Sequence, residues 1–156
     1  MNITDLLEPE RIICCSEAGS KKRLLESLSA RLAESTSQAT KNDIFDALVN
    51  REKLGSTGLG KGVAIPHGRM ASLTAPACAF IKLDKPVEFD ASDGQPVDLI
   101  FALLVPEDST EEHLQVLSTI AEIFSNPTIC ATLRECDTGR CILEQLYQWE
   151  SHRISA

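Results

Sequence analysis

One histidine of this chain stands in a context that favours chemistry over packing. His67 lies between Pro66 and Gly68, at the end of the short apolar run 63–66, which predicts a strand. Proline restricts the backbone before the histidine and glycine leaves space beside it, so the imidazole is poorly placed to fill a core. A neutral imidazole is a competent nucleophile near pH 7 and can carry a phosphoryl group on a ring nitrogen. We therefore predict that His67 is a nucleophile that becomes phosphorylated.

A glycine-rich segment precedes this histidine. Four of the eight residues 55–62 are glycines, and we expect a loop rather than regular structure, because glycine wastes chain entropy unless special dihedrals are needed. Successive backbone N–H groups in such a loop can form a concave anion site. The residues that we expect to bind phosphate are Gly55, Ser56, Thr57 and Gly58.

The same segment matches the phosphate loop of nucleotide-binding proteins only in part. Gly55, Gly60 and Lys61 fit the pattern G-x-x-x-x-G-K, but Gly62 stands where that motif needs serine or threonine. The segment also follows a predicted helix and leads into a strand, which reverses the order that the motif requires. The pattern therefore argues against a nucleotide site.

Two further side chains are candidates for contact with a phosphoryl group. Arg51 lies near the end of a predicted helix, where a cation also favours the helix dipole, and arginine is the usual planar partner of phosphate. His113 lies in the first turn of another predicted helix, where a neutral, hydrogen-bonding imidazole is favoured. The alternative for His113 is a partly exposed histidine without a role. We expect no role for His152, in the polar end of the chain.

The charges are distributed unevenly. The whole chain has a net charge of −8, which argues against general binding to nucleic acid or to anionic membranes. Residues 51–70 nevertheless hold four basic side chains and one acidic one, a net charge of +3, and residues 84–112 hold nine acidic side chains and one lysine. We call residues 51–70 the basic strip, and it contains both the glycine loop and His67.

Apolar spacing predicts helices on both sides of a group of strands. A helix is expected over 20–33, and a second runs from Thr40, which forms a capping box with Asp43, to about residue 54. A third begins after 108, where Ser109 and Glu112 have capping-box spacing, and further helices are expected over 127–134, after the cap Asn126, and about 138–149.

Strands are expected over 11–15, 63–66, 75–83 and 97–105. The last run has almost no alternation, so we expect a central strand covered on both faces. Helices before and after a cluster of strands indicate an α+β fold, a three-layer α/β/α arrangement around a mixed central sheet. With 156 residues and no linker-like segment, we expect one domain over 1–156.

Composition limits the setting of the protein. No apolar run approaches the roughly 20 residues of a membrane-spanning helix. Residues 1–10 contain three acidic side chains and no basic one, unlike a secretory signal or a transit peptide. The six cysteines include no CxxC pair and do not resemble a zinc site or a disulfide framework. We expect small buried thiols in a reducing cytoplasm, no membrane insertion and no metal.

At this point residues 51–68, REKLGSTGLGKGVAIPHG, resemble a known signature. They are similar to enzyme IIA domains of the mannitol/fructose class of the bacterial phosphoenolpyruvate-dependent phosphotransferase system, known as EIIA type-2 domains. Residues 89–91, residues 95–106 and the pair His113-Leu114 extend the resemblance over nearly the whole chain. In detail the chain most resembles the nitrogen-regulatory members of this class.

The resemblance implies a phosphohistidine carrier. His67 would accept phosphate from the phosphohistidine of a small HPr-like carrier protein, which is itself phosphorylated by enzyme I. Arg51 and His113 would stabilise the phosphoryl group. Because both ends of the transfer are histidine nitrogens, no nucleotide, metal or other cofactor is expected.

Three functions remain open from the sequence. The first is a regulatory phosphocarrier whose phosphorylation state controls target proteins. The second is a sugar-transport IIA component that passes phosphate to a IIB domain of a fructose or mannitol permease. The third is a binding module in which the histidine is silent.

Overall fold

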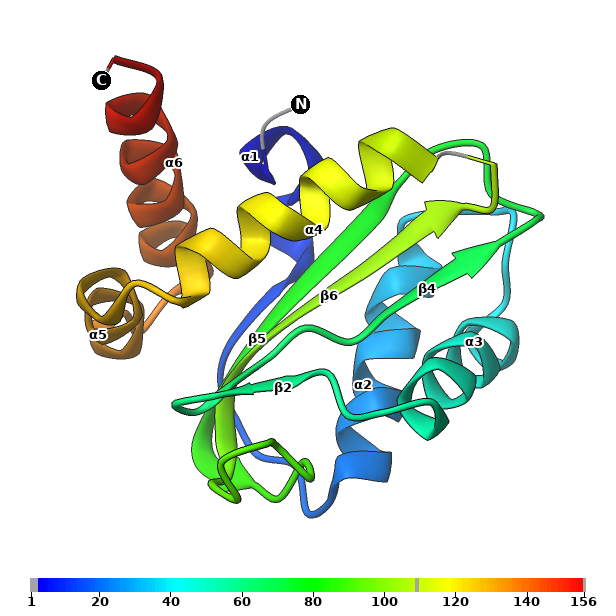
Figure 1. The fold of residues 1–156 in the computed structure, drawn as a ribbon, viewed down its shortest axis with the longest axis horizontal. Helices are drawn as coiled ribbons and strands as arrows, with labels where there is room; N and C mark the ends of the chain where they lie inside the picture. The colour runs from blue at the N-terminus through cyan, green and yellow to red at the C-terminus, as the bar shows by residue number, and fades with distance from the viewer. Residues whose placement is uncertain (1–2, 109, 156) are drawn as a thin grey trace.

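The computed structural model describes residues 3–108 and 110–155. Seven side chains within these ranges are excluded from the description, those of Cys15, Thr110, Glu112, His113 and residues 153–155. A mixed sheet of six strands forms the centre of the molecule, with helices on both faces (Figure 1). The predicted α/β/α layering is therefore confirmed.

The sheet is open and mixed. Its strands are β1 (Ile12–Ser16), β2 (Gly58–Gly60), β3 (Val63–Ala64), β4 (His67–Met70), β5 (Ala77–Val87) and β6 (Val97–Pro106). They follow the order β1-β5-β6-β3-β2, and β4 also pairs with β6. β5 runs antiparallel to β6, whereas β3 and β4 both run parallel to it, one after the other along the same edge.

Strand β6 is buried on both faces, as its continuous apolar sequence predicts. Leu99, Phe101 and Leu103 belong to one core cluster, and the alternate residues Ile100 and Leu104 belong to another. The helices α1 (Ile3–Leu6), α4 (Thr110–Phe124), α5 (Pro127–Glu135) and α6 (Gly139–Ser155) complete the first cluster. The short helix η1 (Pro9–Arg11) lies against α6 and β5. The second is completed by α2 (Lys21–Glu34) and α3 (Lys41–Lys53). Figure 1 shows α3 beside β4, with α4 across the other face.

The predicted helix starts are confirmed at two places. The Thr40 side chain accepts from the Asp43 amide and Asp43 accepts from the Thr40 amide, which completes the capping box of α3. The Asn126 side chain accepts from the first amides of α5, whose first residue is Pro127. The predicted cap Ser109 lies outside the described residues.

The glycine-rich segment is not the continuous loop that the sequence predicts. Gly58–Gly60 form strand β2, which pairs antiparallel with β3. A Cβ at Gly58 would lie 2.8 Å from the Cβ of Ala91, so the missing side chain lets another segment pack on the strand. Backbone entropy alone predicts a loop here, whereas the pairing of β2 with β3 and the contact of Gly58 with Ala91 offset the entropic cost of ordering the glycines.

Strand lengths also depart from the predictions around His67. The expected strand 63–66 is interrupted after Ala64, and the chain rejoins the sheet as β4, which begins at His67. The expected strand 75–83 continues as β5 to Val87, past Pro86. Pairing with β1 on one side and β6 on the other supports this length.

Two helices meet at a sharp angle on the α4 side of the sheet. Within the described residues, no single helix is long and apolar enough to cross a membrane. Leu114–Phe124 and Pro127–Glu135 reach that length and composition only as a pair, and the pair is bent by 77°.

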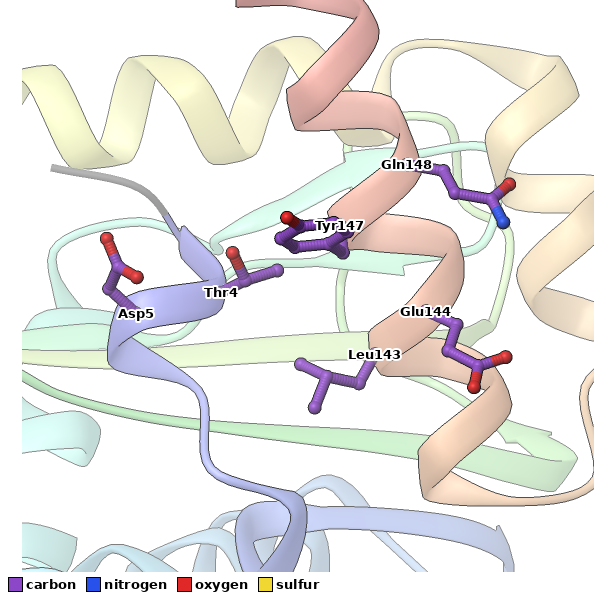
Figure 2. Close-up of a pocket in the computed structure, with 6 residues that line it drawn as sticks. All are labelled: Thr4, Asp5, Leu143, Glu144, Tyr147 and Gln148. Atoms are coloured by element: carbon purple, nitrogen blue, oxygen red, sulfur yellow. The ribbon is translucent and has the colours of Figure 1, made fainter.

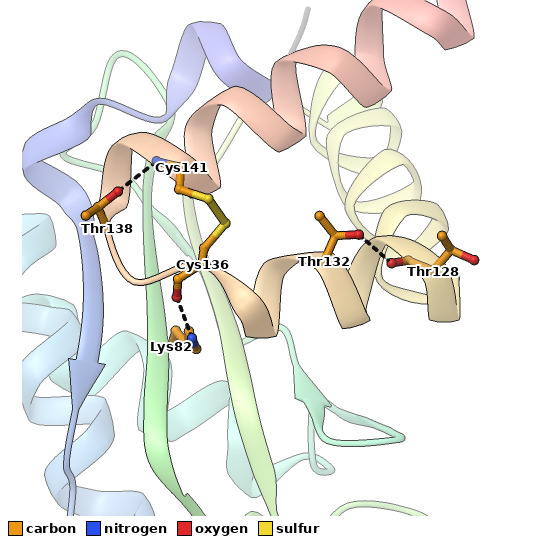
Figure 3. The surroundings of a disulfide bond; sticks show 6 residues. All are labelled: Lys82, Thr128, Thr132, Cys136, Thr138 and Cys141. Carbon is orange, nitrogen blue, oxygen red and sulfur yellow. Dashed lines mark hydrogen bonds between the residues drawn. A yellow bond between two sulfur atoms is a disulfide. The ribbon is translucent and has the colours of Figure 1, made fainter.

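One pair of cysteines corrects the expectation of free thiols. Cys136, which caps the end of α5, is disulfide-bonded to Cys141 in the first turn of α6 (Figure 3), with the two Cα atoms 5.6 Å apart. The reversal of the chain between the helices brings the two residues together, and their spacing alone does not reveal it. Cys78 and Cys130 are buried free thiols, as expected.

This disulfide is expected to stabilise the folded protein. It closes a short loop, because its cysteines are five residues apart, and a loop of this size restricts the unfolded chain by about 2 kcal/mol. Urea unfolding should show that loss of free energy when a reducing agent is added. A Cys136→Ser/Cys141→Ser variant should unfold at the same urea concentration under both conditions, and a wild-type midpoint that ignores the reductant would contradict the prediction.

Candidate functional site

His67 is the first residue of β4, and its ring is held by the backbone just before it. It pairs with Leu103 of β6 and is half-buried. The ring Nδ1 lies 2.8 Å from the carbonyl oxygen of Ile65. Because a carbonyl oxygen only accepts, Nδ1 carries the hydrogen in this contact, and the lone pair of the neutral ring is then on Nε2.

Helix α3 packs closely against β4 at Gly68. A Cβ at Gly68 would lie 3.4 Å from the Cβ of Ala47, on the face of α3 that packs against the strand. This close approach brings the last turn of α3, which carries Arg51, beside His67.

Arg51 and His67 line one cavity of about 410 Å³. Four of its residues come from a single face of α3 or from its C-terminal end, where they have the spacing i, i+3, i+4 and i+7. The whole lining consists of Ala47, Asn50, Arg51, Leu54, His67, Gly68, Arg69, Leu114 and Leu117. The structure thus brings together two of the three predicted side chains, Arg51 and His67.

The third predicted side chain, that of His113, lies outside the described residues. Its backbone belongs to α4, one position before Leu114, which lines the cavity. The helix that carries His113 therefore borders the site.

The environment of His67 favours its neutral form. Burial is the largest cause that lowers the pKa of His67 below its ordinary value, and the positive charges of Arg51 and Arg69 lower it further. The hydrogen bond to Ile65 and the negative charge of Glu52 act in the opposite direction. The net lowering leaves the ring uncharged near neutral pH, which a nucleophile requires.

In the predicted phosphate loop, most backbone amides donate hydrogen bonds to other groups of the chain. The Gly55 amide donates to the Glu52 carbonyl oxygen, and the Thr57 amide donates to the Glu52 carboxylate. The Gly58 amide donates to the Ser56 hydroxyl, which donates to the carbonyl oxygen of Phe89. Three of the four loop amides thus have partners within the chain.

The loop also fixes the arginine of the site. The Arg51 Nη1 donates to the Gly55 carbonyl oxygen at 2.8 Å. This contact restrains a long side chain, so less conformational entropy is lost when the guanidinium meets an anion.

Several site residues were not singled out by the sequence analysis. Asn50 and Leu54 line the cavity with Arg51, and their helical spacing from Ala47 is the signal that could have found them. Glu52 does not line this cavity, but its charge acts on His67, and its position in the last turn of α3 gives no sequence signal for that effect.

A second hollow, of about 360 Å³, lies between α1 and α6 (Figure 2). Its lining consists of Thr4, Asp5, Leu143, Glu144, Tyr147 and Gln148, without a histidine. Among the residues that the structure describes, no group of three or more His, Cys, Asp or Glu side chains could hold a metal ion. The chemistry therefore points to the cavity at His67.

Comparison with known proteins identifies the family of the chain that forms this cavity. Residues 5–149 match the model of the phosphoenolpyruvate-dependent sugar phosphotransferase system, EIIA 2. The chain belongs to this EIIA family. A nitrogen regulatory protein of Pseudomonas aeruginosa is 45% identical over 148 residues, which cover 95% of this chain and 94% of that protein.

Solved structures of EIIA domains share the fold. The nitrogen regulatory protein IIA-Ntr of Neisseria meningitidis is 47% identical, has a TM-score of 0.89 and covers 92% of this chain and 98% of its own. The mannitol enzyme IIA of Escherichia coli, solved in complex with phosphorylated enzyme IIB, is 19% identical with a TM-score of 0.76, covering 92% and 99%. The resemblance to nitrogen-regulatory EIIA members is confirmed, and as an EIIA protein the chain is a phosphotransferase-system component.

Proposed function

We propose that this EIIA protein is a phosphohistidine carrier of the nitrogen-regulatory phosphotransferase system. It accepts a phosphoryl group on His67 and regulates other proteins through its phosphorylation state. The observation that carries the proposal is the half-buried imidazole of His67, held at Nδ1 by the Ile65 carbonyl and sharing a cavity with Arg51.

In this proposal Nε2 of His67 is the nucleophile, which is supported by the contact between Nδ1 and the Ile65 carbonyl oxygen. The Nε2 lone pair forms the new N–P bond, while the N–P bond of the donor phosphohistidine breaks and its electron pair returns to the donor ring. Nδ1 keeps its proton and its bond to Ile65. Arg51 compensates the negative charge on the equatorial phosphoryl oxygens.

The proposal also includes the other residues predicted from the sequence. His113 is proposed, on the sequence prediction alone, to donate a second hydrogen bond to the phosphoryl group. For residues 55–58, the engaged amides favour a supporting role, in which the loop holds Arg51 through Gly55.

The surface beside the cavity suits a protein donor. Leu54 and Leu114 are 84% and 60% exposed at its edges, and the basic strip supplies Arg51 and Arg69 to the same cavity. Apolar contacts surrounded by positive charge would dock an HPr-like phosphocarrier and hold its phosphoryl group over His67.

The regulatory role is preferred over sugar transport because of the relatives. The two nitrogen regulatory proteins described above are 45% and 47% identical to this chain, whereas the mannitol enzyme IIA shares 19%. Transfer to a IIB domain remains the alternative. We place the protein in the cytoplasm, where an HPr-like donor and enzyme I operate.

A reconstituted relay tests the proposal. The purified protein is incubated with phosphoenolpyruvate, enzyme I and an HPr-like carrier, and the product should gain one phosphoryl group that is labile in acid and stable in base. Addition of a IIB domain should leave this label in place. Loss of the label to IIB would favour sugar transport, and absence of labelling would reject the carrier role.

Phosphoryl acceptance is expected to be insensitive to pH above neutrality. Burial is the main cause of the lowered pKa of His67, so the nucleophilic neutral ring persists below its ordinary pKa of about 6.5. Single-turnover rates from pH 5.5 to 8 should therefore fall only below that value. Hydrolysis of the phosphorylated donor is measured in parallel, and a half-maximal rate above about 6.5 would contradict the prediction.

Phosphorylation is also expected to weaken binding at the basic strip. A phosphoryl group adds nearly two negative charges next to a strip with a net charge of +3. Unphosphorylated HPr-like carrier should bind the unmodified protein more tightly than the phosphorylated protein, and this difference should shrink as salt screens the charges. A His67→Glu variant should bind with intermediate affinity. Equal binding of both states at low salt would contradict an electrostatic switch.

A further inference from the structure

A buried carboxylate lies behind the site and has no role in the mechanism so far. The Glu52 side chain is only 6% exposed at the end of α3. Its oxygens accept from the Thr57 amide at 3.2 and 3.3 Å and from the Thr57 hydroxyl, and the Lys21 ammonium lies 3.0 Å away. A charge buried this deeply is costly unless it is paired and hydrogen-bonded, and here both conditions are met.

Three hydrogen bonds connect this carboxylate to the imidazole through the backbones of Thr57 and Ile65. The Thr57 amide donates to Glu52, and the Ile65 amide donates to the Thr57 carbonyl oxygen at 3.0 Å. The Ile65 carbonyl oxygen accepts the His67 Nδ1 hydrogen at 2.8 Å. The N–H and C=O groups of each residue belong to different peptide groups, so these bonds transmit position: they fix the backbone of Thr57, then that of Ile65, and thereby the direction of the ring.

This arrangement matches a requirement of the proposed chemistry. When Nε2 of His67 forms a bond to phosphorus and Nδ1 keeps its proton, positive charge develops on the ring. The negative charge of Glu52 stabilises that positive charge through space, and the hydrogen-bonded backbone of Thr57 and Ile65 fixes the direction of the ring. In serine hydrolases a carboxylate that contacts the histidine directly performs the same two tasks.

We propose that Glu52 is a positioning residue for phosphoryl transfer at His67, acting through Thr57 and Ile65; this inference rests on the proposed phosphocarrier function. Glu52 holds the imidazole against the cavity that contains Arg51 and stabilises the positive charge that appears as the N–P bond forms.

Lys21 anchors this carboxylate from the neighbouring helix. Its ammonium donates to the Phe89 carbonyl oxygen at 3.3 Å and lies 4.4 Å from the centre of the Phe89 ring. It also lies 3.7 Å from a carboxylate oxygen of Asp90. Glu52 is thus held from two sides, by Thr57 on the loop and by Lys21 on α2.

The charge of Glu52 also reaches His67 in the resting protein. Burial is the largest influence and lowers the pKa of His67, whereas Glu52 raises it and Arg51 and Arg69 lower it. Removal of the Glu52 charge should therefore lower the pKa of His67 further. This readout needs no phosphorylated partner.

The test compares Glu52→Gln with wild type, using phosphorylated HPr-like carrier as the donor. Glutamine keeps the size and one acceptor oxygen but removes the charge. We expect the transfer rate to fall by about ten- to a hundredfold. This loss is at or below that caused by removing a group that directly stabilises the transition state, because Glu52 acts from a distance. We also expect the pKa of His67, followed by NMR titration, to decrease. Glu88→Gln, a change at an exposed glutamate, should leave both quantities unchanged.

A second variant separates positioning from folding. Glu52→Gln leaves the Lys21 ammonium without its buried partner, which can unfold the protein. The double variant Lys21→Met/Glu52→Gln removes both charges and should regain stability while its transfer rate stays low. Recovery of the wild-type rate together with stability would overturn the proposal and leave Glu52 a purely structural residue.

The failure of this inference differs from the failure of the proposed function. Wild-type protein that accepts phosphate, with a Glu52→Gln variant of equal rate and equal His67 pKa, would overturn the positioning role alone. Wild-type protein that accepts no phosphate would reject the carrier function. In that case an unchanged His67 pKa in Glu52→Gln would also overturn the coupling between the two side chains.

Discussion

Replacement of His67 with alanine is expected to abolish phosphoryl acceptance. The imidazole supplies the nitrogen lone pair that accepts the phosphoryl group in our proposed mechanism, and pairing with Leu103 of β6 holds the backbone of this residue. The variant should fold normally, because His67 is half-buried at the start of a strand and its removal leaves the two apolar cores intact.

The measurement is incorporation of phosphate from labelled phosphoenolpyruvate in the presence of enzyme I and the HPr-like carrier. His152→Ala is the matched control, because His152 is an exposed histidine on α6 and should be dispensable. Circular dichroism and urea unfolding establish that both variants are folded. Normal labelling of His67→Ala would place the phosphoryl group on another residue.

The layered fold could be predicted because its strongest signals are local. The continuous apolar run of β6 predicted a strand covered on both faces, and the capping box at Thr40 marked the start of α3. Such patterns depend on neighbouring residues in the sequence. The short strands could not be found in this way, because β2 and β4 exist only through their pairing with β3 and β6.

The two central residues of the site could also be predicted. Pro66 and Gly68 marked His67 as a poor core residue, and Arg51 begins the signature that ends at Gly68. The structure adds the reason that they meet, which is the close packing of Ala47 against Gly68.

The remaining parts of the site depend on contacts that the sequence does not display. A glutamate in the last turn of a helix is an ordinary residue, and only the fold places Lys21 beside Glu52. The glycine content of the loop predicts amides that are available for an anion, whereas Glu52 and Ser56 bind three of the four. The Cys136–Cys141 bond likewise depends on a reversal between two helices.

Replacement of Arg51 is expected to slow phosphoryl transfer by about 10²- to 10³-fold, the usual loss when a preorganised donor to a developing charge is removed. Arg51→Ala removes both the positive charge and the contact with Gly55. Single-turnover transfer from the phosphorylated HPr-like carrier measures the effect. Arg140→Ala, at an exposed arginine on α6, is the control and should transfer at the wild-type rate.

Arg51→Lys separates the charge of the guanidinium from its shape. Burial is the main cause of the lowered pKa of His67, and the charge of Arg51 adds to it, so Arg51→Ala should move that pKa upward. Arg51→Lys keeps the charge and should leave the pKa near its wild-type position. Its transfer rate should nevertheless fall, because an ammonium cannot bind Gly55 and two phosphoryl oxygens with one planar group. If the lysine variant transfers at the wild-type rate, charge alone suffices, and the planar contact has no part in the transfer.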